Sequence, residues 1–253
     1  MKLFNKTTNY PSLFDKSKTL TELGNLYEAD KGNSNPQDLS WGKDFPNHPC
    51  MSYTTTYEKY MINYRELPIK FFELGICDKR FPYASQKMWL SYFKNIDLYG
   101  MDNFWGTYLH EKKEEIKSLN ELGANFVYAD QGNFCDWNEI KKECPNNFDF
   151  FIEDGSHWPN HMAVTLWHAR DLIKSGGYYF MEDLQNPQVS RGMFKYDNSL
   201  LAEDLLDTQK TGMFNSHFLN NSQNEDLNRS FELVEMVLDS KHINYLVVFK
   251  KRK

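Results

Sequence analysis

The sequence predicts an α/β protein with a doubly wound, mostly parallel seven-stranded sheet. From residue 67 onward, short apolar runs alternate with segments of helical spacing, which is the pattern of successive βαβ units. Two β-rich runs near the end of the chain are typical of an antiparallel hairpin. The 253 residues are 40% hydrophobic and 16% aromatic, so a large core can form and global disorder is excluded.

The expected strands are short apolar runs bounded by polar residues or glycine. The run FDFFIE at residues 148–153 is apolar on both faces, as expected of a buried strand. The last two runs are joined by Asp239, Ser240, Lys241 and His242, which predicts the hairpin. We expect strands at residues 69–76, 96–101, 125–129, 148–153, 178–181, 231–238 and 243–250.

The expected helices lie before, between and after these strands. The helix that begins at Pro159 is predicted to end at Ser175, Gly176 and Gly177, because glycine is a frequent helix stop. We expect helices at residues 20–27, 56–64, 85–93, 109–122, 137–142, 159–174 and 200–211.

Composition divides the chain at about residue 66. Residues 1–66 are polar and aromatic without a clear strand pattern, which predicts an N-terminal helical extension. Residues 67–253 carry the α/β pattern and form the predicted main domain. Within it, residues 186–228 are rich in Asn, Gln, Asp and Ser, and we expect them to cap the carboxyl ends of the strands.

Charge and hydropathy exclude two classes of partner. The formal net charge of −6 excludes a generally basic nucleic-acid binder. No apolar run approaches the ~18 residues of a membrane helix, and the N-terminus lacks the apolar core of a signal peptide. We therefore expect a cytoplasmic protein without membrane insertion. The four cysteines follow no CxxC or zinc spacing, so we expect reduced thiols.

Polar residues follow the first three expected strands. Glu73 and Gly75 end the first strand, Asp102 ends the second, and Asp130 and Gln131 follow the third. An acid at the second strand end can accept both hydroxyls of a ribose, and ligands bind at this edge of open α/β sheets. Each residue alone can also be a simple turn former. Together they predict a nucleoside-containing cofactor.

The loop after the first strand distinguishes between cofactors. Gly75 is followed by Ile76-Cys77-Asp78-Lys79-Arg80, so the G-x-G-x-x-G pattern of dinucleotide-binding folds is absent. Asp78 would repel a pyrophosphate, whereas a cofactor with an ammonium or a sulfonium group tolerates an acid. S-adenosylmethionine carries both groups and is therefore favoured.

Three carboxylates follow the next two expected strands. Asp154 ends the fourth strand, and Glu182 and Asp183 end the fifth. Oxygen ligands of this kind suit Mg²⁺ or Ca²⁺. In the alternative, Asp154 caps the following helix and the other two acids are solvated. Without a cation the three charges would repel one another, so the sequence favours a metal site.

His157 follows Asp154 by three residues at the start of a predicted helix. The helix N-terminus and a nearby cation both disfavour the imidazolium, so a neutral base would be available for alkylation of a hydroxyl. The alternative is a histidine that only hydrogen-bonds a turn. His161, one helical turn further on, could face the same site or simply pack.

The motifs together resemble the class I S-adenosylmethionine-dependent methyltransferases, and among them the metal-dependent sugar O-methyltransferases of the mycinamicin and macrocin type. The resemblance runs from about residue 26 to residue 184. It is carried by FDFFIEDGSH at 148–157, His161, Gly176-Gly177 and MEDL at 181–184. It implies the Rossmann-like class I fold, Mg²⁺ on Asp154, Glu182 and Asp183, and His157 as general base.

The N-terminal extension carries further similarity. The elements EADKG at 28–32 and SY at 52–53 with Tyr57-Glu58 resemble segments that close over the cofactor in this family. The resemblance implies cofactor contacts by Lys31, Tyr57, Glu73, Gly75, Asp102, Asp130 and Gln131. The family's glycine-rich continuation is replaced here by Cys77-Asp78-Lys79-Arg80.

The sequence thus predicts an S-adenosylmethionine- and Mg²⁺-dependent O-methyltransferase. The expected acceptor is a sugar with vicinal hydroxyls, nucleotide-linked, such as a heptose for a bacterial capsule or other surface polysaccharide. Two alternatives remain open: a metal-dependent hydrolase or hydroxylase that uses the same carboxylates and His157, and a non-catalytic sugar- or nucleotide-binding module. The sequence also leaves a homo-oligomer open.

Overall fold

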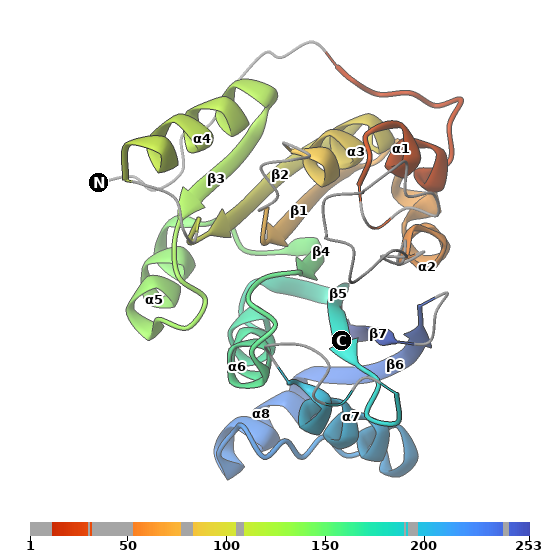
Figure 1. The fold of residues 1–253 in the computed structure, drawn as a ribbon, viewed down its shortest axis with the longest axis vertical. Coiled ribbons are helices and arrows are strands. Elements are labelled where there is room, and N and C mark those ends of the chain that lie inside the picture. Colours follow the sequence, from red (N-terminus) through yellow and green to blue (C-terminus); the bar gives the residue numbers. More distant parts are fainter. Residues whose placement is uncertain are drawn as a thin grey trace, which may run out of the picture.

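One sheet of seven strands runs through the molecule. In chain order the strands are β1 (Pro68–Leu74), β2 (Asn95–Asp102), β3 (Ala124–Tyr128), β4 (Phe148–Glu153), β5 (Ile173–Gln185), β6 (Phe231–Leu238) and β7 (Asn244–Lys251). Their order in the sheet is β3-β2-β1-β4-β5-β7-β6 (Figure 1). Strands β1 to β5 are parallel, and β7 is antiparallel to β5 and β6. The predicted fold class is confirmed.

The computed structural model describes residues 12–29, 31, 53–76, 83–104, 109–189, 191, 197–239 and 243–253. Its helices are α1 (Leu20–Leu26), α2 (Tyr53–Met61), α3 (Ala84–Tyr92), α4 (Leu109–Leu122), α5 (Phe134–Glu143), α6 (Pro159–Ala169), α7 (Ser199–Thr211) and α8 (Asn221–Ser230), and a 3-10 turn, Ile62–Tyr64, follows α2. None of the helices in these ranges combines the length and apolarity that a membrane crossing needs.

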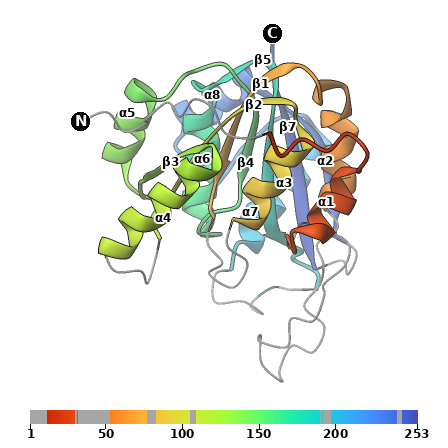
Figure 2. The ribbon, with the colours of Figure 1, turned by 90° about the horizontal axis from the view of Figure 1, so that it is seen from above.

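Helices cover both faces of the sheet (Figure 2). Because side chains alternate along a strand, neighbouring residues pack into two separate cores on opposite faces of the sheet. Phe71 and Phe150 face the core shared with α1 to α4. Phe72 and Phe151 stack with their ring centroids 4.6 Å apart in the core shared with α5 to α8. These buried faces hold the strand ends in fixed positions.

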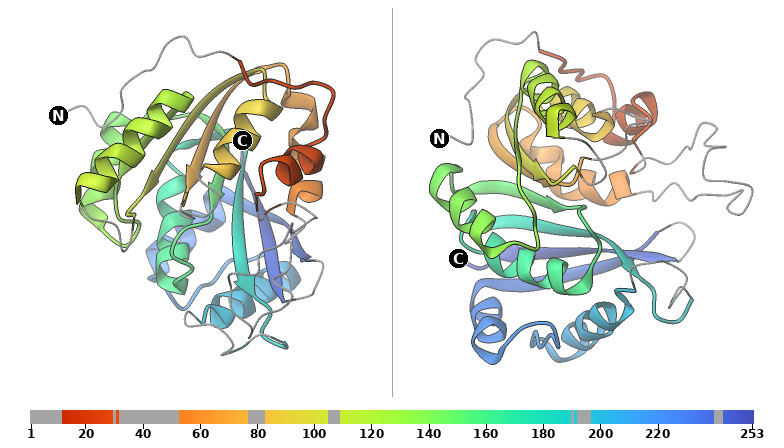
Figure 3. Two further views of the ribbon diagram at one scale, coloured as in Figure 1. Left: turned by 45° about the horizontal axis from the view of Figure 1, so that its top comes forward. Right: turned by 60° about the vertical axis from the view of Figure 1, so that its left-hand side comes forward.

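The N-terminal helices pack into the first of these cores. Helix α1 begins with a capping box in which Thr19 and Glu22 satisfy each other's backbone amides. Helix α1 lies beside both α2 and α3 (Figure 3). Tyr57 on α2 makes an edge contact with Phe180 of β5, with ring centroids 4.9 Å apart. The described part of the N-terminal extension is therefore continuous with the sheet's core.

The end of α6 corrects a prediction. The helix ends at Ala169, and residues 173–185 form a long β5, so Gly176 and Gly177 are strand residues and not a helix stop. A side chain at Gly177 would place its Cβ 2.9 Å from the carbonyl oxygen of Phe148, and the β4–β5 register shifts between Phe148 and Phe150. The glycines thus allow a bulge and a close approach between strands.

The segment predicted as a cap contains two helices. Helix α7 was expected, but α8 was not, although Asn220 and Gln223 form a capping box at its start. The two helices lie beside α6 on the sheet (Figure 1), and Leu201 and Leu205 of α7 are buried in the core. That residues 186–228 also cover the strand ends remains a prediction.

One histidine is buried among aromatic rings in the second core. His168, near the end of α6, is 1% exposed, and its ring stacks on Trp137 with centroids 5.0 Å apart. Phe134 and Trp167 approach its ring edge-on. Within the described ranges neither ring nitrogen has a hydrogen-bond partner. Burial lowers the pKa of His168 to about 3, so the folded protein holds it neutral.

We predict that His168 makes the fold acid-sensitive. Its pKa is lower in the folded chain than the ordinary value of 6.5, so the unfolded chain takes up a proton first as the pH falls. The stability from this group is complete above pH 6.5 and is lost progressively between pH 6.5 and pH 3. Between neutral pH and roughly pH 5, the free energy of unfolding of His168→Phe should fall by about 2 kcal/mol less than that of the unmodified chain. Denaturant unfolding at several pH values measures this, and identical pH slopes for both proteins would contradict it.

Candidate active site at the carboxyl ends of the strands

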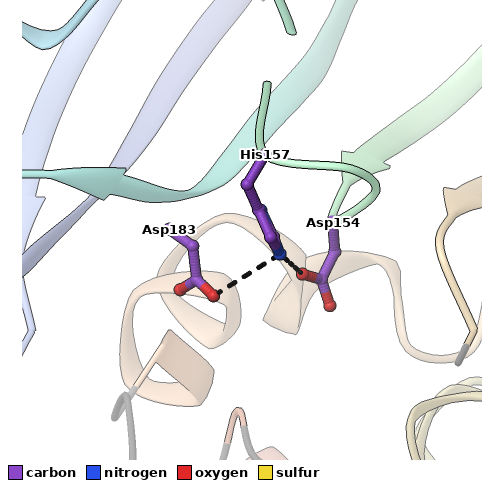
Figure 4. A group of neighbouring side chains, drawn as sticks. All are labelled: Asp154, His157 and Asp183. Atoms are coloured by element: carbon purple, nitrogen blue, oxygen red, sulfur yellow. Dashed lines mark ion pairs between the residues drawn. The ribbon is translucent and has the colours of Figure 1, made fainter. Parts of the chain in front are cut away.

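Three potential ligand side chains meet where β4 and β5 end (Figure 4). Asp154 follows β4, His157 lies in the next loop, and Asp183 lies near the end of β5. The Nε2 atom of His157 is 3.8 Å from Oδ1 of Asp154 and 3.9 Å from Oδ2 of Asp183. One ligand atom from each residue lies within 4.8 Å of the others. From the strand ends the sequence predicted that Asp154 and Asp183 meet, together with Glu182, and it predicted His157 as the base beside them.

Backbone irregularities aim these side chains. His157 has φ 57° and Asp183 has φ 55°, a left-handed conformation that costs energy for residues other than glycine. The β5–β7 register shifts between Met181 and Leu184, around the Glu182–Asp183 pair. A bulge of this kind re-aims side chains at the end of a strand.

Asn198 holds the two strained residues together. It is fully buried just before α7, and its Nδ2 donates to the carbonyl oxygens of His157, at 3.2 Å, and Asp183, at 3.0 Å. The sequence did not indicate this role, because Asn198 lies in a polar segment with no motif. Its place shows that the predicted cap region reaches the site at this residue.

His157 lies among opposing electrostatic effects. Burial lowers the pKa of its imidazole, but the charges of Asp183 and Asp154 outweigh burial and raise the pKa above its ordinary value. Its Nδ1 atom has no hydrogen-bond partner in the described part of the chain. The other ring nitrogen, Nε2, faces the carboxylates of Asp154 and Asp183.

Glu182 is held differently from the two aspartates. It is 2% exposed, accepts a hydrogen bond at Oε2 from Nζ of Lys31 at 2.9 Å, and accepts another at Oε1 from the hydroxyl of Tyr57. Lys31 also donates to Oδ2 of Asp154 at 2.5 Å, and the hydroxyl of Tyr53 donates to Asp183 at 2.9 Å. All three predicted metal carboxylates are thus bonded to the N-terminal extension.

These contacts add to what the sequence indicated. Lys31 and Tyr57 contact the carboxylates, and their expected contacts with the cofactor stay a prediction. Glu182 lies beside Asp154, since the ammonium of Lys31 contacts both, and His157 lies between Asp154 and Asp183. The three carboxylates offer the oxygen ligands that a divalent cation prefers, so the described residues fit a metal, and the metal ligation itself stays a prediction.

The end of β1 lies directly against the loop after β4. Gly75 has φ 91°, and a Cβ there would lie 1.8 Å from the carbonyl oxygen of Asp154. Glu73 is completely buried beneath α3 and accepts hydrogen bonds from Gln86 Nε2 at 2.7 Å and Trp89 Nε1 at 3.1 Å. Burial raises its pKa, which these bonds oppose. Glu73 therefore joins β1 to α3 at the predicted cofactor edge.

Asp102 fastens the loops after β1 and β2. Its two oxygens accept from the backbone amides of Ile76 at 2.7 Å and Phe104 at 2.5 Å. Burial raises its pKa, again against these hydrogen bonds. The carboxylate is at the strand end where a ribose was predicted, and its ribose contact remains a prediction. Residues 77–82, which include the Cys77–Arg80 departure, lie outside the described ranges.

Gln131, predicted as a cofactor contact, has a connecting role that the sequence did not indicate. Its Nε2 donates to Glu153 at 3.0 Å and Thr165 at 3.2 Å, and its Oε1 accepts from the amide of Ser156 at 2.7 Å. The side chain thus ties β4 and α6 to the loop that carries the candidate ligands. Its predicted adenine contact is untested, and in this structure its amide is engaged within the protein.

Asp130 and His161 lie close to this connection. Asp130 accepts from the amide of Gly132 at 2.8 Å and thereby shapes the turn after β3. His161 contacts the hydroxyl of Ser156 through Nδ1 at 2.9 Å, and burial lowers its pKa. It packs tightly enough over Gly132 that a Cβ there would meet its ring at 2.5 Å. His161 therefore supports the loop and does not belong to the ligand group.

The chain is similar to known sugar O-methyltransferases over part of its length. No family model matches the chain. It is 28% identical over 137 residues to the 8-demethyl-8-(2-methoxy-alpha-L-rhamnosyl)-tetracenomycin-C 3'-O-methyltransferase of Streptomyces olivaceus, covering 52% of this chain and 32% of that protein. It is 25% identical over 135 residues to the mycinamicin VI 2''-O-methyltransferase of Micromonospora griseorubida, covering 52% and 31%. The match thus spans about a third of these relatives' length.

Solved structures support the fold. The chain is similar to the MycE methyltransferase of the mycinamicin pathway in complex with Mg and SAH, with a TM-score of 0.61 and 19% identity, over 93% of this chain and 55% of that one. The complex that also contains mycinamicin VI gives a TM-score of 0.62 and 20% identity over the same shares. The predicted methyltransferase fold and the predicted resemblance to sugar O-methyltransferases are confirmed.

We predict that Gly75 is essential for the geometry of the site. In Gly75→Ala the new Cβ would collide with the Asp154 backbone, so unfolding free energy should fall by about 3 kcal/mol or more. Gly176→Ala is the matched control, because Gly176 also has positive φ (80°) but no neighbour within 4 Å. Its cost should be about 1 kcal/mol. Equal losses in denaturant unfolding would show that the close approach is unimportant.

Proposed function

We propose that this chain is an S-adenosylmethionine-dependent O-methyltransferase that acts on a sugar hydroxyl with the aid of a divalent cation. The single observation that carries the proposal is the meeting of His157 with Asp154 and Asp183 at the carboxyl ends of β4 and β5. That group combines a base with cation ligands at the edge where ligands bind in open α/β sheets. The named activities of the curated relatives support the same reaction.

In this proposal the cofactor lies along the ends of β1, β2 and β3. Asp102 accepts the ribose hydroxyls, and Asp130 lies toward the adenine. Because Gly75 has no side chain, the backbone after β1 leaves room for the cofactor. Glu73 fixes that backbone through its hydrogen bonds to α3. The short distance from Gly75 to Asp154 supports this arrangement, because it brings the cofactor edge next to the proposed acceptor site.

The acceptor hydroxyl is activated by this chain's own residues. Nε2 of His157 accepts the proton of the hydroxyl, and Asn198 keeps the imidazole in place through its backbone carbonyl. Asp154, Glu182 and Asp183 would hold a divalent cation, which when bound supplies positive charge that lowers the pKa of a neighbouring hydroxyl. The hydroxyl oxygen would then bond to the methyl group while the bond from that methyl to the cofactor's sulfur breaks, which leaves S-adenosylhomocysteine.

The acceptor is a sugar with neighbouring hydroxyls. The curated relatives are named for methylation of sugars on antibiotics, which supports the sugar class. Within that class we propose a nucleotide-linked sugar, such as a heptose destined for a surface polysaccharide. A metal-dependent hydrolase or hydroxylase could use the same ligand group, and the products of the reaction distinguish it.

The direct test is an assay of methyl transfer. The purified chain is incubated with S-adenosylmethionine, Mg²⁺ and a panel of nucleotide-linked and antibiotic-linked sugars, and S-adenosylhomocysteine and the methylated sugar are quantified. We expect both products in equal amounts, loss of turnover in EDTA and recovery on addition of excess Mg²⁺. A hydrolysed or hydroxylated product without S-adenosylhomocysteine would refute the reaction. Full turnover after exhaustive chelation would refute the metal's part in it.

We predict that His157→Ala lowers kcat by about 10²- to 10⁴-fold, because a general base contributes that much. Cofactor affinity, measured by calorimetry, should stay nearly unchanged. His161→Ala is the control: its imidazole contacts Ser156 and not the carboxylates, so it should lose much less kcat. If both variants lose activity equally, and only in proportion to their folded fraction, His157 is not the base.

A further inference from the structure

The ammonium of Lys31 lies between two of the proposed metal ligands. Nζ is 2.5 Å from Oδ2 of Asp154 and 2.9 Å from Oε2 of Glu182. The residue is 1% exposed, so water screens these interactions very little. A lysine is almost never buried this deeply unless it is paired. The contacts are therefore a built ion-pair site and not an incidental surface contact.

Lys31 occupies carboxylate oxygens on two of the three proposed metal ligands. Glu182 accepts from Lys31 at one oxygen and from Tyr57 at the other, so both of its carboxylate oxygens are engaged. Asp154 presents one oxygen to Lys31 and the other toward His157. The ammonium joins Asp154 to Glu182 through one oxygen of each, so a divalent cation that bound the same two oxygens would have to displace it.

We propose that Lys31 is an internal cation that competes with the divalent cation for Asp154 and Glu182. The inference rests on the metal site of the proposed function and extends it. Before the metal binds, the ammonium offsets the repulsion among the three carboxylates. When the metal binds, Lys31 leaves the two carboxylates. The apparent affinity for the metal is lowered by the free energy of breaking the lysine contacts.

The first measurement is of metal binding alone. Mn²⁺ is titrated into the full chain, without cofactor or sugar, and free Mn²⁺ is followed by electron paramagnetic resonance. Lys31→Met removes the charge and keeps the side-chain length, so it should bind Mn²⁺ about tenfold or more tightly than the unmodified chain. Lys31→Arg keeps the charge and should bind weakly. Lys59→Met is the control, since Lys59 pairs with Glu235 at the surface.

The second measurement follows Lys31 itself in the unmodified chain, so it does not depend on whether a variant folds. An amine-acylating reagent is applied with and without saturating Mn²⁺, and labelling at Lys31 is quantified by mass spectrometry. We expect Lys31 to be protected without Mn²⁺ and labelled with it. Lys59, which is exposed, should be labelled equally in both states and reports the reagent's activity.

The proposal requires both results. Equal or weaker Mn²⁺ binding by Lys31→Met overturns it, and so does unchanged protection of Lys31 at saturating Mn²⁺. If Mn²⁺ binds but these results fail, Lys31 does not compete, and the proposed methyl transfer still stands. If neither the unmodified chain nor Lys31→Met binds Mn²⁺, both the competition and the metal site of the proposed function are refuted.

Discussion

The repulsion among Asp154, Glu182 and Asp183 is the constraint on which the site depends. Parallel strands end at one edge of the sheet, so acids placed after β4 and β5 are forced together. Burial of Glu182 strengthens that repulsion, because little water is present to screen it. The positive charge of Lys31 and the hydroxyls of Tyr53 and Tyr57 offset it. The N-terminal extension is thus part of the charge balance of the site.

The site is also held by amides that carry no charge. Asn198 joins the backbones of His157 and Asp183, and Gln131 joins β4 and α6 to the loop between them. His157 and Asp183 both have left-handed backbone conformations, which persist only where the surroundings fix them. The buried amides of Asn198 and Gln131 hold this part of the backbone in place through several hydrogen bonds each, and they add no charge to the site.

The sequence was sufficient for the parts of the fold and site that follow local patterns. The ends of β4 and α4 were predicted to the residue. Asp154, Glu182 and Asp183 were predicted to meet because strand ends share an edge, and His157 was placed beside them because it follows Asp154 by three residues. The long β5 was missed because Gly176 and Gly177 give the same local signal in a bulge as in a helix stop.

Other features could not be predicted because they depend on tertiary contacts. The partners of Gln131 come from three separate elements, and nothing near Gln131 in the sequence identifies them. Asn198 likewise acts on residues from two different segments. The contact of Lys31 with Asp154 and Glu182 was not predicted either, because the family resemblance indicated only a cofactor contact, which stays a prediction.

The sequence distance between Lys31 and its partner has a consequence for how the molecule forms. Lys31 precedes Glu182 by 151 residues, and Tyr57 precedes it by 125. On the ribosome the N-terminal extension emerges long before β5 exists, so these side chains stay hydrated until the fifth strand joins the sheet. Closing such long loops is entropically costly and slow. The part of the site that is synthesised first therefore cannot be completed before β5 has joined the sheet.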